Sequence, residues 1–522
     1  MKRKSLIVIG FLLAAITTFG QLAQPFRFEQ EVKESEEGFV VIPMKTEGMA
    51  LVNGTNTYEH GKRTWTVEIL DTTLTSRWQT GVQLENTQNF IGYEYTPRHL
   101  YLLFRSGEYQ GHSFRLVQMN FHTKETRIST VEFELNFRIA YFTVCGDNAV
   151  FGGYVNSEPA VLLFDQSSEH PKVLPGLFVK DVELLDVRAN QNETFNVLLV
   201  ERRTKEKDIL TLRTYDHEGQ LLLDENMEVD AKYSVLSAIT SSLEREELLV
   251  AGTYAEGTSK QALGIFTVQI DPFNEESIQY VDFASLEHFL DYLKPRKASK
   301  IRTKANQQKA AGLPPDYRLY AKPMRLEERT DGYYLLTESY NPSGGGSSYW
   351  PGSYYSPYYG NYGAYPSYSP FRRYNSYYDP FPYTTSRSYD FRMIPSAVIK
   401  LSPTGKPVKD LSIKLDEVRQ SGLEQISDFF VHRDSIYLAF KKQGKVFYVK
   451  EHSEGEEDSL TSELVVRSRD ASEKTDEDDE GYLRYWYGEN FYVWGYQYIK
   501  VYKSEGVEKR NVFYVNRISP GR

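Results

Sequence analysis

One short motif recurs along this chain and restricts the folds that the chain can adopt. Its clearest copy is residues 210–223, where the strand-like run Leu-Thr-Leu-Arg-Thr-Tyr leads into a polar turn at 216–219 and a second apolar run follows. The first five copies lie about 45–55 residues apart, a spacing typical of propeller blades built from several short strands. The copies reach their turn residue at Asp71, Asn120, Asp165, Asp216, Asp271 and, farther along, Ser402.

The motif predicts an all-β fold, because one four-stranded sheet leaves its faces uncovered whereas a ring of such sheets covers them all. We expect a single β-propeller over residues 21–522. Counting strand-like runs gives eight blades, and seven is the alternative because the first and last units are the least regular. The last unit, residues 482–518, lacks a fourth strand. The strand-like segment 26–32 has no other partner, so we expect it to complete that blade and close the ring.

The composition supports strands and excludes some functions. The 522 residues include 40 Tyr and 29 Phe, which favour strands over helices. The formal net charge of −10 argues against general nucleic-acid binding, which needs clustered cations. Cys145 is the single cysteine, so no intramolecular disulfide can form. It stands at the end of a strand-like run, where we expect a buried, unreactive thiol.

The first 20 residues have the pattern of a secretory signal peptide. Lys2, Arg3 and Lys4 precede an apolar run at 6–19, and small residues precede Gln21. This run is a poor membrane span, and no other stretch is long and apolar enough to be one. We therefore expect export to the periplasm or beyond the cell, with no transmembrane segment after signal removal and a monomeric mature chain.

A helical and basic insertion is predicted at residues 284–316. Ser285 can cap a short helix whose apolar residues Leu286, Phe289 and Leu290 share one face, and Pro295 would end it. A connector then follows that holds cations and no acid, and we expect it to be solvated, with an anion or polyanion contact as the alternative. The cations are Lys294, Arg296, Lys297, Lys300, Arg302, Lys304 and Lys309.

Residues 341–391 differ from the rest of the chain. They contain no Leu, Ile, Val, Lys or Glu and are rich in Tyr, Gly, Ser and Pro. Such a segment cannot bury enough aliphatic surface to offset its ordering entropy, so we expect a loop that projects from one blade. Tyrosine rings offer stacking faces and hydroxyls at low entropic cost, which suits glycans or protein surfaces. The candidate binding residues are Tyr354, Tyr355, Tyr358, Tyr359, Tyr362, Tyr365 and Tyr368.

Three stretches carry a family resemblance. Residues 331–340 (Asp-Gly-Tyr-Tyr-Leu-Leu-Thr-Glu-Ser-Tyr), the Tyr-rich insert and residues 398–405 (Val-Ile-Lys-Leu-Ser-Pro-Thr-Gly) resemble exported β-propeller-type proteins of some Gram-negative bacteria. Those proteins often share equivalents of Trp65 with Asp71-Thr-Thr-Leu74, and of residues 435–440. The resemblance spans most of the mature chain. It implies a propeller fold and export, and it implies no activity and no functional residue.

Motifs for known chemistry are missing from the sequence. None of the nine histidines has zinc-ligand spacing, and no nucleophile elbow or phosphate-binding loop occurs. The acidic loop region at 454–481 includes Asp476-Glu-Asp-Asp-Glu-Gly481, which imitates a calcium loop until Tyr487 falls where a bidentate Glu is needed. We expect a solvated acidic loop there, with a low-affinity cation site as the alternative. We predict no cofactor and no specific metal site.

Three functions remain open from the sequence. The leading hypothesis is an exported binding or scaffolding module for an envelope glycan or protein partner, with loops that form the contact surface. The alternative is a hydrolase or lyase that acts on glycans with carboxylates in the central channel. A third reading is polyanion binding through residues 294–309.

Overall fold

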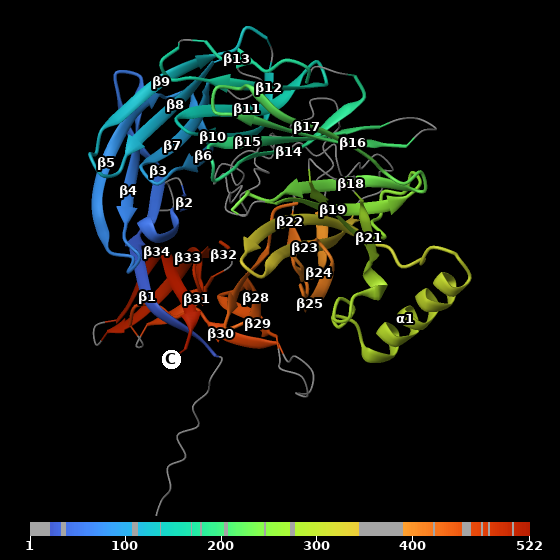
Figure 1. Ribbon diagram of the computed structural model, residues 1–522. Coiled ribbons are helices and arrows are strands. Elements are labelled where there is room, and N and C mark those ends of the chain that lie inside the picture. Colours follow the sequence, from blue (N-terminus) through green and yellow to red (C-terminus); the bar gives the residue numbers. More distant parts are fainter. Residues whose placement is uncertain are drawn as a thin grey trace, which may run out of the picture.

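The computed structural model is a ring of eight sheets that surround one axis (Figure 1). Each sheet is one blade, and its four main strands run in chain order from the axis outward, except that the last blade takes its outermost strand from the N-terminus. The eight-bladed β-propeller predicted from the motif spacing is therefore confirmed. The structure describes residues 21–32, 38–106, 113–135, 137–168, 170–177, 180–202, 207–244, 247–271, 277–343, 390–420, 423–451, 461–470, 473–478, 481–503 and 506–521.

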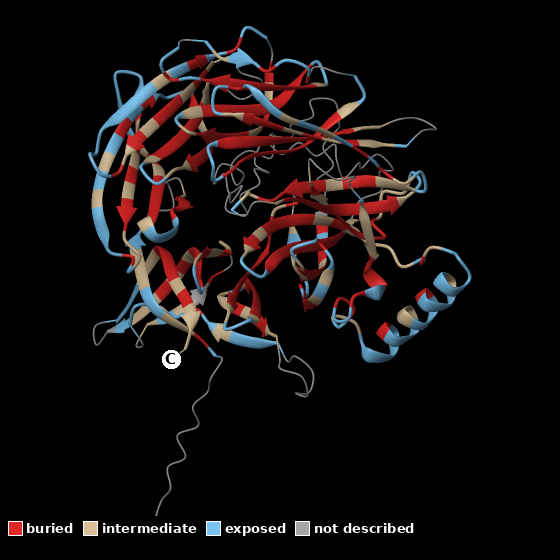
Figure 2. Ribbon diagram, in the orientation of Figure 1, coloured by how far each residue is buried: buried red, intermediate tan, exposed pale blue. Residues whose placement is uncertain are grey.

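The two inner positions of each blade hold the most buried strands (Figure 2). From blade 1 to blade 8, the innermost strands are β2 (Val40–Pro43), β6 (Gln88–Tyr95), β10 (Phe137–Cys145), β14 (Val182–Ala189), β18 (Tyr233–Thr240), β22 (Tyr320–Arg329), β27 (Ser427–His432) and β32 (Leu483–Tyr487). The second strands are β3 (Met49–Glu59), β7 (His99–Ser106), β11 (Asn148–Val155), β15 (Thr194–Glu201), β19 (Leu248–Glu256), β23 (Gly332–Ser343), β28 (Ser435–Lys442) and β33 (Asn490–Lys503).

The two outer positions complete the sheets. The third strands are β4 (Lys62–Leu70), β8 (Ser113–Asn120), β12 (Glu158–Phe164), β16 (Ile209–Asp216), β20 (Gly264–Ile270), β24 (Asp390–Leu401), β29 (Lys445–Lys450) and β34 (Gly506–Pro520). The outermost strands are β5 (Ser76–Glu85), β9 (Thr126–Glu132), β13 (Lys172–Val173), β17 (Leu221–Glu228), β21 (Gln279–Asp282), β25 (Pro407–Lys414), β30 (Ser462–Val465) and β1 (Leu22–Glu31). Two further strands, β26 (Arg419–Gln420) and β31 (Lys474–Glu477), pair with β24 and β33.

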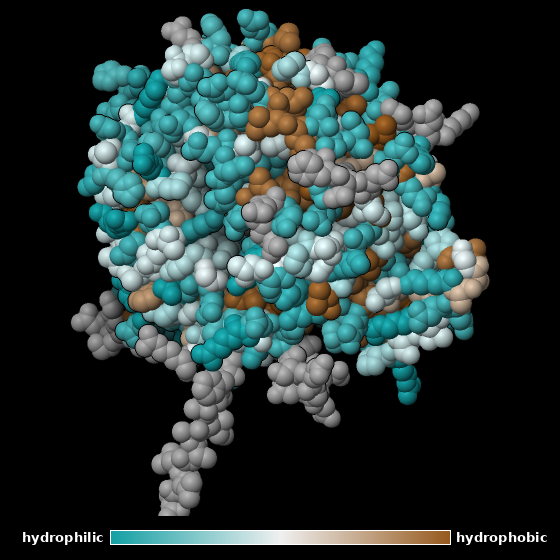
Figure 3. All heavy atoms as spheres, in the orientation of Figure 1, coloured by the Kyte–Doolittle hydropathy of each residue, from teal (hydrophilic) through white to brown (hydrophobic). Residues whose placement is uncertain are grey.

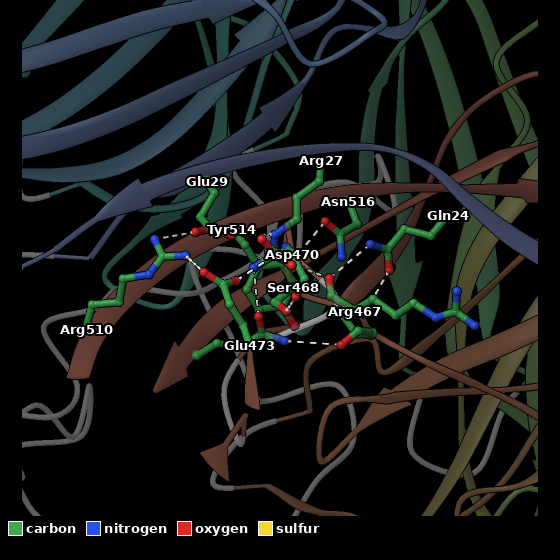
Figure 4. A network of polar contacts seen from close by, with 12 residues as sticks. Gln24, Arg27, Glu29, Arg467, Ser468, Asp470, Glu473, Arg510, Tyr514 and Asn516 are labelled. Atoms are coloured by element: carbon green, nitrogen blue, oxygen red, sulfur yellow. Dashed lines mark hydrogen bonds and ion pairs between the residues drawn. The ribbon is translucent and has the colours of Figure 1, made fainter. Parts of the chain in front are cut away.

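The N-terminal strand closes the ring, as the sequence predicted. β1 runs antiparallel to β34, with Arg27 opposite Asn516 and Glu31 opposite Val512. A network of polar side chains joins this strand to the rest of blade 8 and to Arg467 and Glu473 (Figure 4). β1 pairs with the edge that β34 would otherwise present and so joins the two ends of the chain in one sheet.

Eight apolar clusters fill the spaces between the blades, one for each pair of neighbours. The pair formed by blades 8 and 1 is included, because Trp486, Trp494 and Phe513 pack with Val41 and Leu51. The face of the ring in Figure 3 is mainly hydrophilic, with some apolar patches. In blades 3 and 4, Val173, Leu221 and Leu222 are more than half exposed. The core thus runs around the ring as a series of sheet-to-sheet contacts.

The recurring polar residue of the motif is a turn-former. In each of five blades it ends or follows the third strand and accepts hydrogen bonds from backbone N–H groups that lie two to four residues farther on. Asp216, for example, accepts from Glu218 at 3.0 Å and from Gln220 at 2.8 Å. Side chains of this kind stabilise the tight connection to the outermost strand. The five residues are Asp71, Asn120, Asp165, Asp216 and Ser402.

The predicted helix is displaced along the chain. Residues 286–293 form turns after the short 3-10 helix η2 (Phe283–Ser285), and the helix α1 spans Pro295–Ala310. Pro295 begins this helix instead of ending an earlier one, because proline at the first helical position lacks only an N–H that would have no intrahelical partner. Phe289 and Leu290 are buried in the cluster between blades 5 and 6. Their spacing matches a helix because both face this cluster, although the backbone there forms turns. A second 3-10 helix, η1, spans Lys45–Glu47.

The described ends of the predicted Tyr-rich loop are strand, and residues 344–389 lie outside the described residues. β23 and β24 remain paired beyond position 340, with Asn341 opposite Arg392, Pro342 opposite Phe391 and Ser343 opposite Asp390. Phe391 is fully buried. The ends of the expected loop 341–391 are therefore strand, because neighbouring apolar side chains bury the aromatic residues there.

Candidate functional site

A cluster of polar and aromatic side chains joins the innermost strands of blades 6, 7 and 8. The guanidinium of Arg325 on β22 lies over the ring of Phe429 on β27, at 4.0 Å, and over the ring of Tyr485 on β32, at 4.5 Å. Its Nη2 donates a hydrogen bond to the carbonyl oxygen of Phe429 at 2.6 Å. Arg325 directly follows a β-bulge in β22. The extra residue of a bulge changes the direction in which the following side chains point.

Asp428 is the acidic partner in this cluster and is fully buried. Its Oδ1 lies 3.2 Å from Nε of Arg325 and accepts a hydrogen bond from the backbone N–H of Phe429, while its Oδ2 accepts one from the backbone N–H of Tyr485 at 2.8 Å. Burial raises the pKa of this carboxyl, although Arg325 favours its charged form. Asp428 thus ties its own strand to the inner strands of both neighbouring blades.

Other buried acids near the axis make the same kind of link between neighbouring blades. Asp186 on β14 accepts hydrogen bonds from the N–H and the hydroxyl of Thr240 on β18, at 2.8 and 3.0 Å. Glu338 on β23 accepts from the backbone N–H groups of Ile426 and Ser427, at 2.9 and 2.7 Å. Burial raises the pKa of Asp186 to about 6 and that of Glu338 to about 7. These acids therefore act as inter-blade hydrogen-bond acceptors.

Glu327 is a partly accessible carboxylate of the cluster, with a side chain that is 16% exposed. Its Oε2 lies 3.1 Å from Nη2 of Arg325, and its Oε1 accepts from Nη1 of Arg329 at 3.0 Å. Tyr485 stands beside these groups, and burial raises its pKa to about 12. A glycan-cleaving site at the axis would have to use a carboxylate of this kind, which solvent can reach.

The seven tyrosines proposed as a binding surface lie outside the described residues. The structure fixes only the place where their segment joins the ring, at the pair Ser343 and Asp390. Three residues before Ser343, Tyr340 is paired and stacked with Tyr320, the first residue of β22, with 5.7 Å between ring centroids. The insertion that contains α1 enters β22 at Tyr320, so it and the Tyr-rich segment meet blade 6 at the same end of the sheet.

Asp410 and Ser412 on β25 hold the insertion against blade 6. The carboxylate of Asp410 accepts hydrogen bonds from the backbone N–H groups of Glu287 and His288, both at 2.8 Å. The hydroxyl of Ser412 donates to the carbonyl oxygen of His288 at 2.7 Å. Burial raises the pKa of Asp410 to about 6. The start of the insertion is thus fixed by hydrogen bonds to the outermost strand of blade 6.

Asp478 differs from the solvated acidic loop predicted at 454–481, whereas residues 454–460, 471–472 and 479–480 of that prediction lie outside the described residues. Asp478 is buried, and its carboxylate lies 2.7 Å from Nζ of Lys441, whose side chain is 2% exposed. Gln497 and Tyr514 also donate hydrogen bonds to Asp478, at 2.8 Å and about 3 Å. The Lys441 ammonium already pairs with this carboxylate, so Asp478 is not a free ligand of the kind that a calcium loop provides. Lys474–Glu477 form the strand β31.

Within the described ranges, no three His, Cys, Asp or Glu side chains are grouped so that they could hold a metal ion. In the same ranges, no helix combines the length and the apolar character that crossing a membrane requires. Cys145 is buried, and burial raises the pKa of its thiol to about 12, so the thiolate is disfavoured there.

The sequence did not single out the inner-strand cluster. Its members come from three blades, and no local spacing brings Arg325, Asp428 and Tyr485 together. A weaker signal was present, because Glu338 and Asp428 are acids inside strand-like runs that are otherwise apolar. Buried acids in such runs are rare unless they are paired or hydrogen-bonded.

Comparisons with known proteins give only distant matches. No family model matches the chain, and no curated protein matches it. Among solved structures, the Dos1 propeller aligns at 9% identity and a TM-score of 0.38, covering 83% of this chain and 92% of that chain. The β-propeller domain of the Trilobed protease from Pyrococcus furiosus aligns at 11% and 0.34, covering 81% and 95%. The polysaccharide lyase Uly1 aligns at 9% and 0.35, covering 94% and 99%.

Proposed function

We propose that this protein is an exported binding or scaffolding module for an envelope glycan or protein partner. The Tyr-rich segment is the proposed contact, with Tyr354, Tyr355, Tyr358 and Tyr359 among its seven candidate residues. Export rests on the signal-like residues 1–20, and mass spectrometry of the native protein should find a mature N-terminus near Gln21. An intact Met1 on abundant protein inside the cell would contradict export.

The observation that best supports a binding role is that the buried inner acids make hydrogen bonds between blades. Asp186, Glu338 and Asp428 each accept hydrogen bonds from a neighbouring blade. Such contacts hold the sheets of a closed ring in fixed positions, which suits a protein that presents loops to a partner. The segment that carries the tyrosines starts and ends at one strand pair of this ring, so its two ends are held together.

The competing function is a hydrolase or lyase that cleaves glycans. Its support is the Glu327 carboxylate, which is partly exposed between Arg325 and Arg329. A cleavage reaction would need this acid, or a pair of acids near it, to transfer a proton or attack the sugar. The inner acids that are fully buried are poorly placed for this role because a substrate could not reach them.

Replacing residues 344–389 with a short Gly-Ser turn tests the binding role. The ladder between β23 and β24 should persist, because loop-closure entropy changes by only about 0.6 kcal/mol per doubling of length. We expect the melting temperature to stay within a few degrees while retention on isolated envelope fragments is lost. Unchanged retention would contradict the role of the segment. Collapse of the fold would instead mean that the tyrosines are part of the ring's structure.

A further inference from the structure

The helix α1 has a packed side and a basic side. Ala298 and Ala305 are its buried residues, and α1 stands beside the ring with most of its surface exposed (Figures 1 and 2). Arg296, Lys297 and Lys300 are exposed, and Lys300 lies four residues after Arg296 and three after Lys297, so the three share the side opposite the buried Ala298 and Ala305. Lys304 extends the same side, which gives a row about 12 Å long at 1.5 Å per residue.

The cations of α1 divide into paired and unpaired groups. Toward the ring, Nζ of Lys309 lies 2.6 Å from Asp282, and Nη2 of Arg302 lies 3.5 Å from Asp291. On the outer side, Lys304 pairs with Asp316. Arg296, Lys297 and Lys300 form no ion pair with any residue that the structure describes. The charges that hold the helix in place are therefore separate from those that remain available for a partner.

The outer cations weaken the helix that carries them. Arg296 and Lys300 are spaced i, i+4, and Lys297 and Lys300 are spaced i, i+3, and each such like-charge pair costs about 0.2–0.5 kcal/mol. The first turn contains no acid, so its positive charges also oppose the helix dipole. A bound anion would relieve both effects.

We propose that this basic face binds an anionic polysaccharide. The proposal rests on the binding-module function and adds to it a second contact surface with a defined ligand charge. Thr303 and Gln307 are exposed beside the cations, so the face offers hydroxyl and amide groups together with positive charge. Sugar hydroxyls and carboxylates or sulfates can use both kinds of group.

Other anionic partners fit this face less well. A helix that lies on a lipid surface buries an apolar face, whereas α1 exposes no large apolar side chain and the nearest one, Leu313, follows the helix. A stable protein interface usually has an apolar centre, which the basic row lacks. Duplex nucleic acid is too wide to contact the helix alone, so its phosphates would also face the rest of a protein whose formal charge is −10. A slender polar polymer that contacts the helix alone avoids all three problems.

Calorimetric titration with polygalacturonate, a linear carboxylated polysaccharide, tests the proposal. We expect it to bind while neutral dextran does not, with an affinity that falls steeply as salt increases. The triple variant Arg296→Gln, Lys297→Gln, Lys300→Gln should bind at least about tenfold more weakly, as expected for the loss of three exposed charge contacts. Its melting temperature should be unchanged or slightly higher, because glutamine keeps the helix propensity and removes the repulsion.

A matched control distinguishes the loss of the cations on α1 from the loss of any three positive charges. The variant Lys62→Gln, Lys124→Gln, Lys406→Gln removes three exposed cations that lie in or beside turns on blades 1, 2 and 6, and it should bind within about twofold of the wild type. Equal losses in both triple variants, or no loss in the helix variant, would overturn the proposal. Tighter binding of duplex DNA or of phosphatidylglycerol vesicles at the same ionic strength would also overturn it.

The result can be separated from the test of the Tyr-rich segment. The protein that lacks residues 344–389 retains α1, so it should bind polygalacturonate as the wild type does. If envelope retention survives the removal of that segment, the proposed contact fails while the polygalacturonate result stands. If the trimmed protein also loses polygalacturonate, the basic face does not act by itself and this inference is wrong.

Discussion

Glu29 on β1 and Arg510 on β34 form an ion pair of 2.6 Å, although they belong to opposite ends of the chain. The same carboxylate lies 2.7 Å from Nε of Arg27, and Arg510 also contacts Glu473 at 2.5 Å (Figure 4). The side chain of Glu29 is only 1% exposed. The polar network thus fixes the strand that closes the ring, in addition to the backbone ladder between β1 and β34.

Deleting residues 21–34 should lower the melting temperature far more than the loss of a frayed terminus would, since it opens the edge of β34 and uncovers the residues under β1. The single variant Glu29→Gln should lower the free energy of unfolding by about 1–3 kcal/mol, because it leaves buried donors poorly paired. Phe26→Ala is the control, because Phe26 is 37% exposed. Thermal denaturation of the three proteins measures these effects, and an unchanged melting temperature after the deletion would show that closure does not depend on β1.

Much of this architecture could be predicted because it follows from local patterns. Apolar alternation located the strands, and the Asp turns located the ends of the third strands. The segment at 26–32 was assignable to the last blade because that unit lacked a fourth strand and the segment had no other partner. The sequence placed the helix too early because the spacing of Leu286, Phe289 and Leu290 shows only that these side chains face the core. A series of turns can bury side chains at the same spacing as a helix.

The polar contacts at the axis and at Asp478 could not be predicted. A run of acids indicates solvation when it is considered alone, yet Lys441 on β28 pairs with Asp478 across two blades. The Arg325 cluster likewise combines residues from β22, β27 and β32. Such contacts depend on which side chains the closed ring brings together, and one sequence does not contain that information.

The Glu338 carboxyl predicts a pH dependence of stability. Its pKa is about 7 in the folded protein against 4.5 as the ordinary value, because burial disfavours the charge. The folded state therefore binds a proton more tightly than the unfolded state, so this contribution to stability falls as pH rises from about 4.5 to 7. Denaturant titrations should find wild type and Glu338→Gln similarly stable near pH 4.5, and between there and pH 8 the wild type should lose on the order of 3 kcal/mol relative to Glu338→Gln. A difference that does not change with pH would contradict a buried, titrating Glu338.

The pair of Lys441 and Asp478 predicts a second stability effect. Lys441→Met should destabilise the protein by about 3–5 kcal/mol, because it leaves the buried Asp478 charge without its cation. The double variant Lys441→Met, Asp478→Leu should recover most of the loss, since apolar residues of similar volume replace a buried pair well. Chemical denaturation measures all three proteins. If the single variant is as stable as the wild type, or if calcium raises the stability of the wild type, Asp478 is not held by Lys441 as described.

The central proposal is that the ring binds an envelope partner and does not cleave it. The direct measurement is to incubate wild type and Glu327→Gln with purified envelope glycan and to record, in one sample, both the bound protein and the release of new sugar ends. Glu327→Gln keeps the size of the side chain and removes the accessible carboxylate beside Arg325 and Arg329. We predict saturable binding by both proteins, with equal affinity and no release above the protein-free control. Release of new ends by the wild type that is abolished in Glu327→Gln would contradict the account.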